Sequence, residues 1–187
     1  MVLRKTASLL LALMLLAGSF GLLAGSGRAF YRSAYPRRYA EYVERSSREF
    51  GIDEALVYAV IYTESGFDPQ VQSSVGARGL MQITEETFLW LRGRMGEGDG
   101  ASYEDLYGPE LNIRCGTFLL AELTREFGSA ENALCAYHAG WGKAKEWLAS
   151  GEYSDGERIH TIPYGDTRRY VDKVSRTREI YETLYKK

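Results

Sequence analysis

The feature that most constrains the fold is a succession of segments, starting near Tyr35, whose apolar residues recur at helical spacing. Residues three or four positions apart share one face of a helix, so each segment has a face to bury. Gly51 suits the end of the first segment, and Asp53, Thr84 and Ser129 suit the starts of later ones. The expected helices are residues 35–50, 54–65, 85–95, a helix opening at Pro109, 130–139, 143–149 and 166–187. No segment alternates as a strand would, so we predict an all-α domain.

Two of these segments should supply much of the core. Residues 54–65 are apolar almost all round, as expected of a buried helix. The helix that opens at Pro109 carries an apolar stripe made of Ile113, Gly116, Leu120, Leu123 and Phe127. Between them, residues 66–79 are rich in Gly, Ser and Pro, which predicts an irregular loop.

The amino terminus has the features of an export signal. Arg4 and Lys5 precede an apolar stretch from Ala7 to Ala24. The stretch is longer than the ~7–15 apolar residues of a usual signal peptide and shorter than a ~20-residue membrane span. We expect residues 1–29 to be an uncleaved anchor in the cytoplasmic membrane, with a signal peptide cleaved near Ala29 as the alternative. Either way residues 30–187 should form one extracytoplasmic domain.

Charge and cysteine content narrow the range of partners and cofactors. Residues 30–187 carry 20 basic and 25 acidic residues, a net charge of −5. Binding to nucleic acid through phosphates needs a basic surface, so no nucleic-acid partner is expected. Cys115 and Cys135 lack the spacing of a zinc site, and we expect no metal or organic cofactor. Both cysteines lie in apolar helical patterns, which favours two buried thiols over a disulfide.

Glu64 is the carboxylate whose position is most suggestive. Leu56, Val60 and Glu64 fall on one face of the helix predicted over residues 54–65. Desolvation at the end of a buried helix raises the pKa of a carboxyl group. A carboxylic acid still protonated near neutral pH can protonate the leaving oxygen of a glycosidic bond. The alternative is a structural glutamate that pairs with an arginine or caps a helix.

Several short motifs follow in a fixed order. They are Glu64-Ser65-Gly66-Phe67-Asp68-Pro69, Gly76-Ala77-Arg78-Gly79-Leu80-Met81-Gln82, Asn112-Ile113, Ala136-Tyr137-His138-Ala139-Gly140 and Thr167-Arg168-Arg169-Tyr170-Val171. In this order and spacing they resemble the catalytic domain of the soluble lytic transglycosylases, glycoside hydrolase family 23, from about residue 50 to residue 174. The resemblance implies a lysozyme-like α fold with a groove for a glycan strand of peptidoglycan.

The resemblance also implies roles for individual residues. Glu64 matches the family's catalytic glutamate, and the implied substrate-binding residues are Ser73, Met81, Gln82, Tyr137, His138 and Tyr170. Among these, Ser73 matches a serine beside the substrate's N-acetyl group. Met81 matches a residue of the groove wall, and Tyr170 a tyrosine near the glutamate.

The implied reaction needs one carboxyl group, whereas most glycosidases use two. We expect Asp68 to organise a turn, and Glu85 and Glu86 to stabilise a helix start, so no second acid is indicated. In the lytic route Glu64 protonates the leaving oxygen while the substrate's N-acetyl group assists at the anomeric carbon. The 6-hydroxyl of N-acetylmuramic acid then closes a 1,6-anhydro ring. An intramolecular hydroxyl has a high effective molarity, so water need not be activated.

Three residues depart from the family's usual pattern: His138 replaces Asn, Glu85 replaces Pro and Gly108 replaces Asp. His138 can still donate a hydrogen bond and titrates near neutral pH, although a purely structural histidine is the alternative. None of the three removes the proposed acid.

Rival functions stay open. A hydrolytic muramidase of the goose-lysozyme type shares much of the motif order, but there an Asp commonly follows the Gly-Leu-Met-Gln block, where this chain has Thr84. An inactive peptidoglycan-binding module would keep the groove, although the intact motif residues favour an enzyme. A helical interaction domain would leave the Gly-rich loop unexplained. We expect a monomer whose partners are the glycan strand and, through the N-terminal segment, the membrane.

Overall fold

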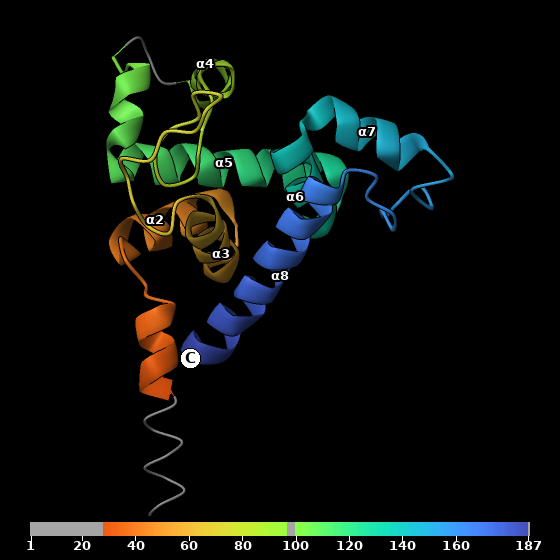
Figure 1. The fold of residues 1–187 in the computed structure, drawn as a ribbon. Helices are drawn as coiled ribbons and strands as arrows, with labels where there is room; N and C mark the ends of the chain where they lie inside the picture. The colour runs from red at the N-terminus through yellow and green to blue at the C-terminus, as the bar shows by residue number, and fades with distance from the viewer. Residues whose placement is uncertain (1–27, 97–99, 187) are drawn as a thin grey trace, which may run out of the picture. The chain divides into compact units, whose positions relative to one another are not determined.

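The computed structural model describes residues 28–96 and 100–186 of the 187-residue chain. Within these residues the regular elements are helices, and pairing between extended residues is limited to three isolated β-bridges (Figure 1). The chain divides into two compact units. The larger is Arg37–Thr183, and the described part of the smaller is residues 28–36 and 184–186. The prediction of an all-α protein is confirmed.

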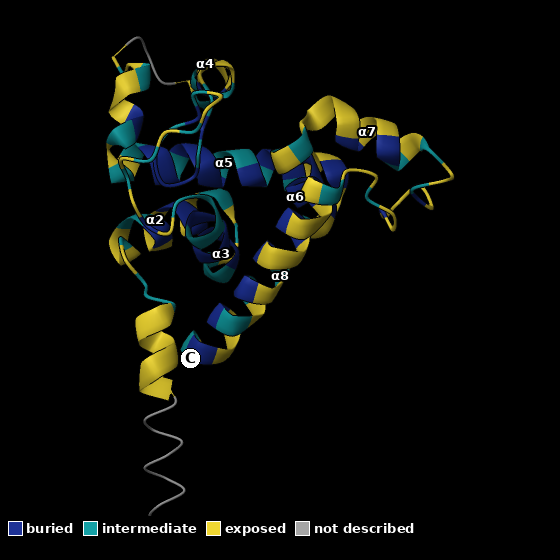
Figure 2. Ribbon diagram, viewed as in Figure 1, coloured by how far each residue is buried: buried dark blue, intermediate teal, exposed yellow. Residues whose placement is uncertain are grey.

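The larger unit is organised around one long helix. Its elements are α2 (Ala40–Phe50), α3 (Glu54–Glu64), α4 (Glu85–Met95), a 3-10 helix (Tyr103–Tyr107), α5 (Pro109–Phe127), α6 (Ala130–Ala139), α7 (Trp141–Ala149) and most of α8 (Gly165–Tyr185). Helix α5 contacts α2, α4, α6 and the 3-10 helix, and so forms the centre of the unit. Figure 2 shows α3 and long stretches of α5 as buried.

The predicted caps explain where three helices begin and where one ends. The Asp53 carboxylate accepts a hydrogen bond from the Ala55 N–H at 3.1 Å, which starts α3. The hydroxyl oxygens of Thr84 and Ser129 accept from the third residue of α4 and of α6 in the same way. Gly51 ends α2 with φ 70°, a left-handed conformation that glycine adopts at low cost.

Two boundaries differ from the sequence prediction. The first helix was expected from Tyr35, but α2 begins at Ala40 because Tyr39 has φ 58°, which interrupts the helical path; residues 28–34 are helical separately. The 3-10 helix Tyr103–Tyr107 was not predicted. It begins where the Asp105 carboxylate accepts a hydrogen bond from the Ser102 N–H at 2.7 Å.

The core is apolar, as the helical stripes predicted. All five residues of the stripe on α5 are buried, as are residues 56–61 of α3. Cys115 and Cys135 are buried free thiols, so the favoured interpretation is confirmed. Burial raises their pKa values to about 11 and about 12, which keeps both thiols protonated and unreactive.

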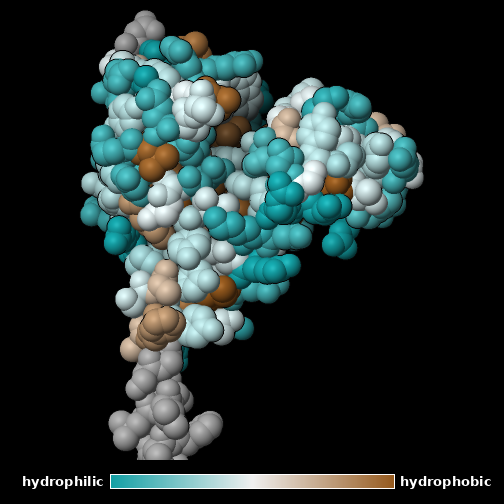
Figure 3. Space-filling view, in the orientation of Figure 1, coloured by the Kyte–Doolittle hydropathy of each residue, from teal (hydrophilic) through white to brown (hydrophobic). Residues whose placement is uncertain are grey.

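The face shown in Figure 3 is mostly hydrophilic, with hydrophobic residues in small groups. Among residues 28–96 and 100–186, none of the helices combines the length and the apolar character needed to cross a bilayer. The predicted export segment, residues 1–29, lies almost wholly outside the described residues. Its identity and the domain boundary at residue 30 therefore stay predictions.

A close approach between α5 and the loop after α3 requires glycine at position 116. A Cβ atom on Gly116 would lie 2.3 Å from the sulfur of Met81 and 2.7 Å from its Cβ. Both residues are fully buried, so neither can move into solvent. The small residue in the α5 stripe therefore lets the loop pack directly on the helix.

Replacing Gly116 with alanine should lower the free energy of unfolding by about 1–3 kcal/mol, because the added methyl group overpacks the core. The measurement is urea unfolding followed by circular dichroism. Gly142→Ala, in a helix where nothing lies within 4 Å of the new Cβ, is the matched control and should leave stability unchanged or slightly higher. Equal losses in the two variants would contradict the packing argument.

Candidate active site

Glu64 is the last residue of α3 and is half-buried. The next residue fixes its position, because the Ser65 hydroxyl donates to the Ile61 carbonyl at 3.1 Å and interacts with the Leu80 carbonyl at 2.9 Å. One hydroxyl thus ties the end of α3 to the chain segment that follows. We call residues 66–82 the glycine-rich loop.

Burial raises the pKa of Glu64 to about 7, although the nearby Tyr170 hydroxyl and the positive charge of Lys173 act in the opposite direction. Taking a carboxylate out of water disfavours its charged form, and here this effect is the largest of the three. The protonated form of Glu64 is therefore well populated near neutral pH. The positive group that acts on Glu64 is a lysine, so the alternative of an arginine-paired structural glutamate is not supported.

Two tyrosine hydroxyls from other helices face the same place. The Tyr137 hydroxyl, from α6, donates to the Met81 carbonyl at 2.7 Å. The Tyr170 hydroxyl, from α8, is buried and has no partner at ordinary hydrogen-bond geometry among the described residues. Burial, followed by the charge of Glu64, raises the pKa of both phenols well above 10. Helices α3, α6 and α8 thus bring Glu64, Tyr137 and Tyr170 together.

His138 adjoins this group from the last turn of α6. Its Nδ1 atom lies 3.0 Å from the Thr167 hydroxyl oxygen, and its ring centroid lies 4.5 Å from that of Tyr170, at an interplanar angle of 33°. The residue as a whole is exposed. Partial desolvation lowers the pKa of His138, while nearby Asp166 acts to raise it.

The glycine-rich loop uses its polar side chains to hold its own backbone. The Ser73 hydroxyl oxygen accepts from the Ala77 N–H at 3.0 Å. The Gln82 side-chain amide donates to the carbonyls of Val71 at 3.1 Å and Gly79 at 2.9 Å. Both side chains are half-buried, so each can still reach a ligand while it supports the loop.

The position of Met81 differs from the prediction that this residue lines the groove wall. Its side chain is fully buried and packs against the backbone of α5 at Gly116. A residue without exposed surface cannot form the wall of an open groove. Met81 instead contributes its backbone carbonyl, which holds the Tyr137 hydroxyl.

Asn112 is a residue whose role the sequence left unassigned, although it belongs to one of the motifs. Its Oδ1 accepts from the Met81 N–H at 2.7 Å, and its Nδ2 donates to the carbonyls of Arg78 at 2.9 Å and Leu106 at 2.8 Å. Gly79 must lack a side chain here, because its Cβ would lie 2.3 Å from Nδ2 of Asn112. Asn112 therefore anchors the glycine-rich loop to α5.

Lys173 and Thr167 are further residues that the sequence did not single out for the site. The Lys173 Nζ lies 3.5 Å from the Thr63 carbonyl, beside the end of α3 that carries Glu64. Thr167 is buried in the first turn of α8 and contacts His138. Both fall within or next to the last motif, which is the one signal that could have indicated them.

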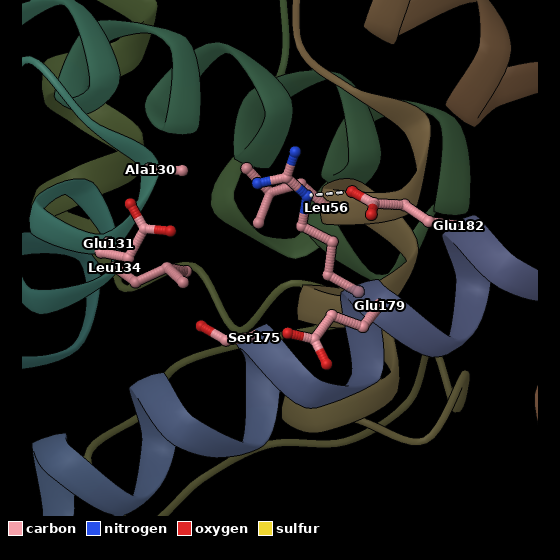
Figure 4. A pocket seen from close by; sticks show the side chains of 8 residues that line it. Leu56, Ala130, Glu131, Leu134, Ser175, Glu179 and Glu182 are labelled. Carbon is pink, nitrogen blue, oxygen red and sulfur yellow. Dashed lines mark ion pairs between the residues drawn. The ribbon is translucent and has the colours of Figure 1, made fainter.

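A separate pocket of about 260 Å³ lies between α3, α6 and α8 (Figure 4). Its lining includes Leu134 and three glutamates, Glu131, Glu179 and Glu182, but none of the seven predicted site residues. Its one cation, Arg178, is already paired with Glu182 at 2.8 Å and with Asp53 at 3.0 Å. Within the described part of the chain, no His, Cys, Asp and Glu side chains cluster in a way that could hold a metal ion.

The balance of effects on Glu64 predicts how its pKa responds to mutation. Tyr170→Phe and Lys173→Met should each raise the pKa of Glu64 above about 7, since each removes a group that stabilises the carboxylate. The pKa can be followed by NMR on protein labelled with 13C at the glutamate carboxyl. Lys143→Met, which removes a lysine paired with Glu146 on α7, should leave it unchanged. A lower pKa in either test variant would refute this account.

Comparison with known proteins identifies the family of the chain. The family model described as the transglycosylase SLT domain matches residues 41–159. The soluble lytic murein transglycosylase of Salmonella typhimurium is 33% identical over 143 residues, which are 75% of this chain and 22% of that protein. The membrane-bound lytic murein transglycosylase C of Edwardsiella ictaluri is 30% identical over 172 residues, covering 79% of this chain and 47% of that protein. The chain thus spans about a quarter to a half of the length of these relatives.

Solved structures give the same assignment. An inactive glutamate-to-glutamine mutant of the lytic transglycosylase Slt from Pseudomonas aeruginosa matches with a TM-score of 0.72 and 30% identity, covering 80% of this chain and 24% of that one. The 70-kDa soluble lytic transglycosylase of Escherichia coli matches with a TM-score of 0.75 and 29% identity, covering 83% of this chain and 26% of that one. Since the family model spans more than half of the sequence, the chain belongs to the transglycosylase SLT domain family and has the lysozyme-like fold of the lytic transglycosylases.

Proposed function

We propose that this chain is a lytic transglycosylase that cleaves the β-1,4 bond between N-acetylmuramic acid and N-acetylglucosamine in peptidoglycan and leaves 1,6-anhydro ends. One observation supports this most strongly: a single half-buried carboxyl group, Glu64, has a pKa of about 7 and faces two tyrosine hydroxyls. In a chain of this family, a carboxyl group with this pKa can donate a proton to the substrate in one step and accept a proton from it in the next.

In the first step Glu64 donates its proton to the leaving oxygen, and the bond between that oxygen and the anomeric carbon breaks. The pKa of about 7 makes this donation effective near neutral pH, because a protonated form is available there. The substrate's own N-acetyl group assists at the anomeric carbon, so a second carboxylate is not needed. The transition state has oxocarbenium character and therefore carries positive charge on the sugar.

In the second step the Glu64 carboxylate takes the proton of the 6-hydroxyl, whose oxygen bonds to the anomeric carbon. The sum of the two steps regenerates protonated Glu64 and consumes no water. The Tyr170 hydroxyl and the Lys173 ammonium stabilise the carboxylate between the steps, since both lower the pKa of Glu64. The Tyr137 hydroxyl, held on the Met81 carbonyl, delimits the other side of the site.

The acidic residues that follow Glu64 in or next to the sequence motifs have structural roles, which supports a mechanism with one acid. Asp68 is exposed and accepts from the Gln70 N–H at 2.9 Å, as a turn-forming aspartate does. Glu85 and Glu86 are exposed in the first turn of α4, where negative charge favours the helix dipole. Neither arrangement resembles the paired carboxylates of other glycosidases.

The glycan would be held by the glycine-rich loop on one side and by α6 and α8 on the other. Ser73 and Gln82 would contact the glycan from the loop side, with the Ser73 hydroxyl next to the N-acetyl group. His138, exposed at the end of α6, would contact the strand from the opposite side. Met81 would act through its carbonyl.

We further propose that the chain acts outside the cytoplasmic membrane. Peptidoglycan lies there, and the apolar segment that follows Arg4 and Lys5 suits export. Relatives with soluble and with membrane-bound names both occur, so anchoring and cleavage near Ala29 are both compatible with the family. The domain would then comprise residues 30–187.

Glu64→Gln should fold and bind glycan strands, but should reduce the clearing of peptidoglycan in a gel by at least about 100-fold, the scale of general acid catalysis. Glutamine keeps the shape of glutamate but holds no transferable proton. Glu86→Gln, an exposed glutamate on α4, is the control and should clear normally. Undiminished clearing by Glu64→Gln would exclude this residue as the acid.

The products should carry 1,6-anhydro-N-acetylmuramic acid, because an intramolecular hydroxyl replaces water as the nucleophile. Mass spectrometry of the wild-type digest measures this directly, since the anhydro product is one water lighter than the product of hydrolysis. Reducing N-acetylmuramic acid ends as the main product would instead identify a hydrolytic muramidase.

A further inference from the structure

We propose that His138 is a positioning residue whose imidazole keeps Tyr170 in place beside Glu64, and whose protonation slows the reaction at acid pH by adding a positive charge there. The inference rests on the proposed function, and it concerns the residue at which this chain departs from its family's usual Asn. It predicts an acid limb in the pH profile that a chain with asparagine at this position lacks.

The first support is that His138 is fixed to α8 at two points one helical turn apart. Its Nδ1 lies 3.0 Å from the hydroxyl oxygen of Thr167, and its ring packs on that of Tyr170 with centroids 4.5 Å apart. Thr167 is 1% exposed and Tyr170 is 7% exposed, so neither partner is free to turn away. The orientation of the imidazole and the position of the phenol therefore depend on each other.

The second support is the state of the Tyr170 hydroxyl. It is buried without a partner at ordinary hydrogen-bond geometry in the described residues, and the polar side chains that act on it are Glu64 and Tyr137. A buried hydroxyl left unsatisfied is costly, so the Tyr170 hydroxyl has a strong tendency to bond the carboxylate once Glu64 has given up its proton. A shift of the Tyr170 ring would change that bond, and His138 is the ring that packs against it.

The third support is that the contact with Thr167 tolerates both protonation states of His138. A hydroxyl can donate to Nδ1 of the neutral ring or accept from the N–H of the charged ring. Protonation therefore adds a positive charge beside Tyr170 without breaking the contact that holds the ring. The local change is electrostatic rather than conformational.

Several groups set the pKa of His138 and therefore the pH at which its imidazole becomes charged. Partial desolvation lowers the pKa of His138, and the N-terminal end of α8, next to Thr167, acts in the same direction. Asp166 and the C-terminal end of α6 favour the charged form. The net effect is a pKa below 6.5, so His138 is neutral at neutral pH and becomes charged as the pH falls.

The added charge opposes the positively charged transition state and the second proton transfer, although it also makes Glu64 a stronger acid in the first step. The transition state carries positive charge on the sugar, which an imidazolium near the site repels. The same charge stabilises the Glu64 carboxylate and makes it a weaker base toward the 6-hydroxyl. A unit charge several ångströms away in a partly buried site changes a rate by roughly 3- to 10-fold or more.

The test compares pH profiles of anhydro-product release by the full-length wild type and His138→Asn between pH 4.5 and 8.5 at constant ionic strength. The wild type should lose activity on the acid side, at a pKa below 6.5, and on the alkaline side near 7, as Glu64 ionises. His138→Asn should keep the alkaline limb and lose the acid limb, by a factor of roughly 3 to 10 at the acid end. Titration of the substrate's own carboxyl groups cancels in the comparison, because the two proteins act on the same substrate.

His160→Asn is the matched control, since the chain has two histidines and His160 is exposed, bonded to its neighbour Thr161 at 3.1 Å. It should reproduce the wild-type profile. An acid limb of equal depth in wild type and His138→Asn would overturn the proposal, as would a wild-type profile with no acid limb.

A second measurement separates this inference from the proposed function. The ring resonances of Tyr170, followed by NMR against pH, should show one inflection below 6.5 that disappears in His138→Asn and another near 7 that disappears in Glu64→Gln. A single inflection, due to Glu64 alone, would refute the link to His138 even in an active enzyme. Both inflections in a protein that releases no anhydro product would leave the link intact and show instead that the proposed function is wrong.

Discussion

The buried side-chain amide of Asn112 is the interaction on which the geometry of the site depends. It accepts a hydrogen bond from Met81 and donates to the carbonyls of Arg78 and Leu106, so one side chain binds three backbone groups. Leaving the buried Met81 N–H unpaired would cost about 1–3 kcal/mol. Because the Met81 carbonyl in turn receives the Tyr137 hydroxyl, the amide that anchors the glycine-rich loop also sets where α6 meets that loop.

The chemistry of Glu64 arises from competition between burial and two stabilising neighbours. Desolvation at the end of α3 is the largest effect on its pKa, and Tyr170 and Lys173 offset part of it. Full burial without these neighbours would hold the proton too firmly to release it, whereas an exposed carboxylate would lack the proton at neutral pH. Residues from two helices, α3 and α8, are therefore needed to place one pKa near 7.

Local signals in the sequence were sufficient for most of the fold. The caps at Asp53, Thr84 and Ser129 form as predicted, because a capping hydrogen bond joins residues only two or three positions apart. The start of α2 and the burial of Met81 were not anticipated. Tyr39 adopts a left-handed conformation that a sequence reader expects only at glycine, so the sequence gives no sign of it. The close contact of Met81 with Gly116 joins segments far apart in the chain.

The sequence by itself determined the helices, the glycine-rich loop and the choice of Glu64, since periodicity, caps and motif order are properties of neighbouring residues. Only the tertiary structure decided what surrounds that carboxylate. His138 meets Thr167 across 29 positions, and Lys173 reaches the end of α3 across 110. The pKa of a buried group depends on desolvation and on charges brought close by packing, and neither follows from the order of residues until the helices have assembled.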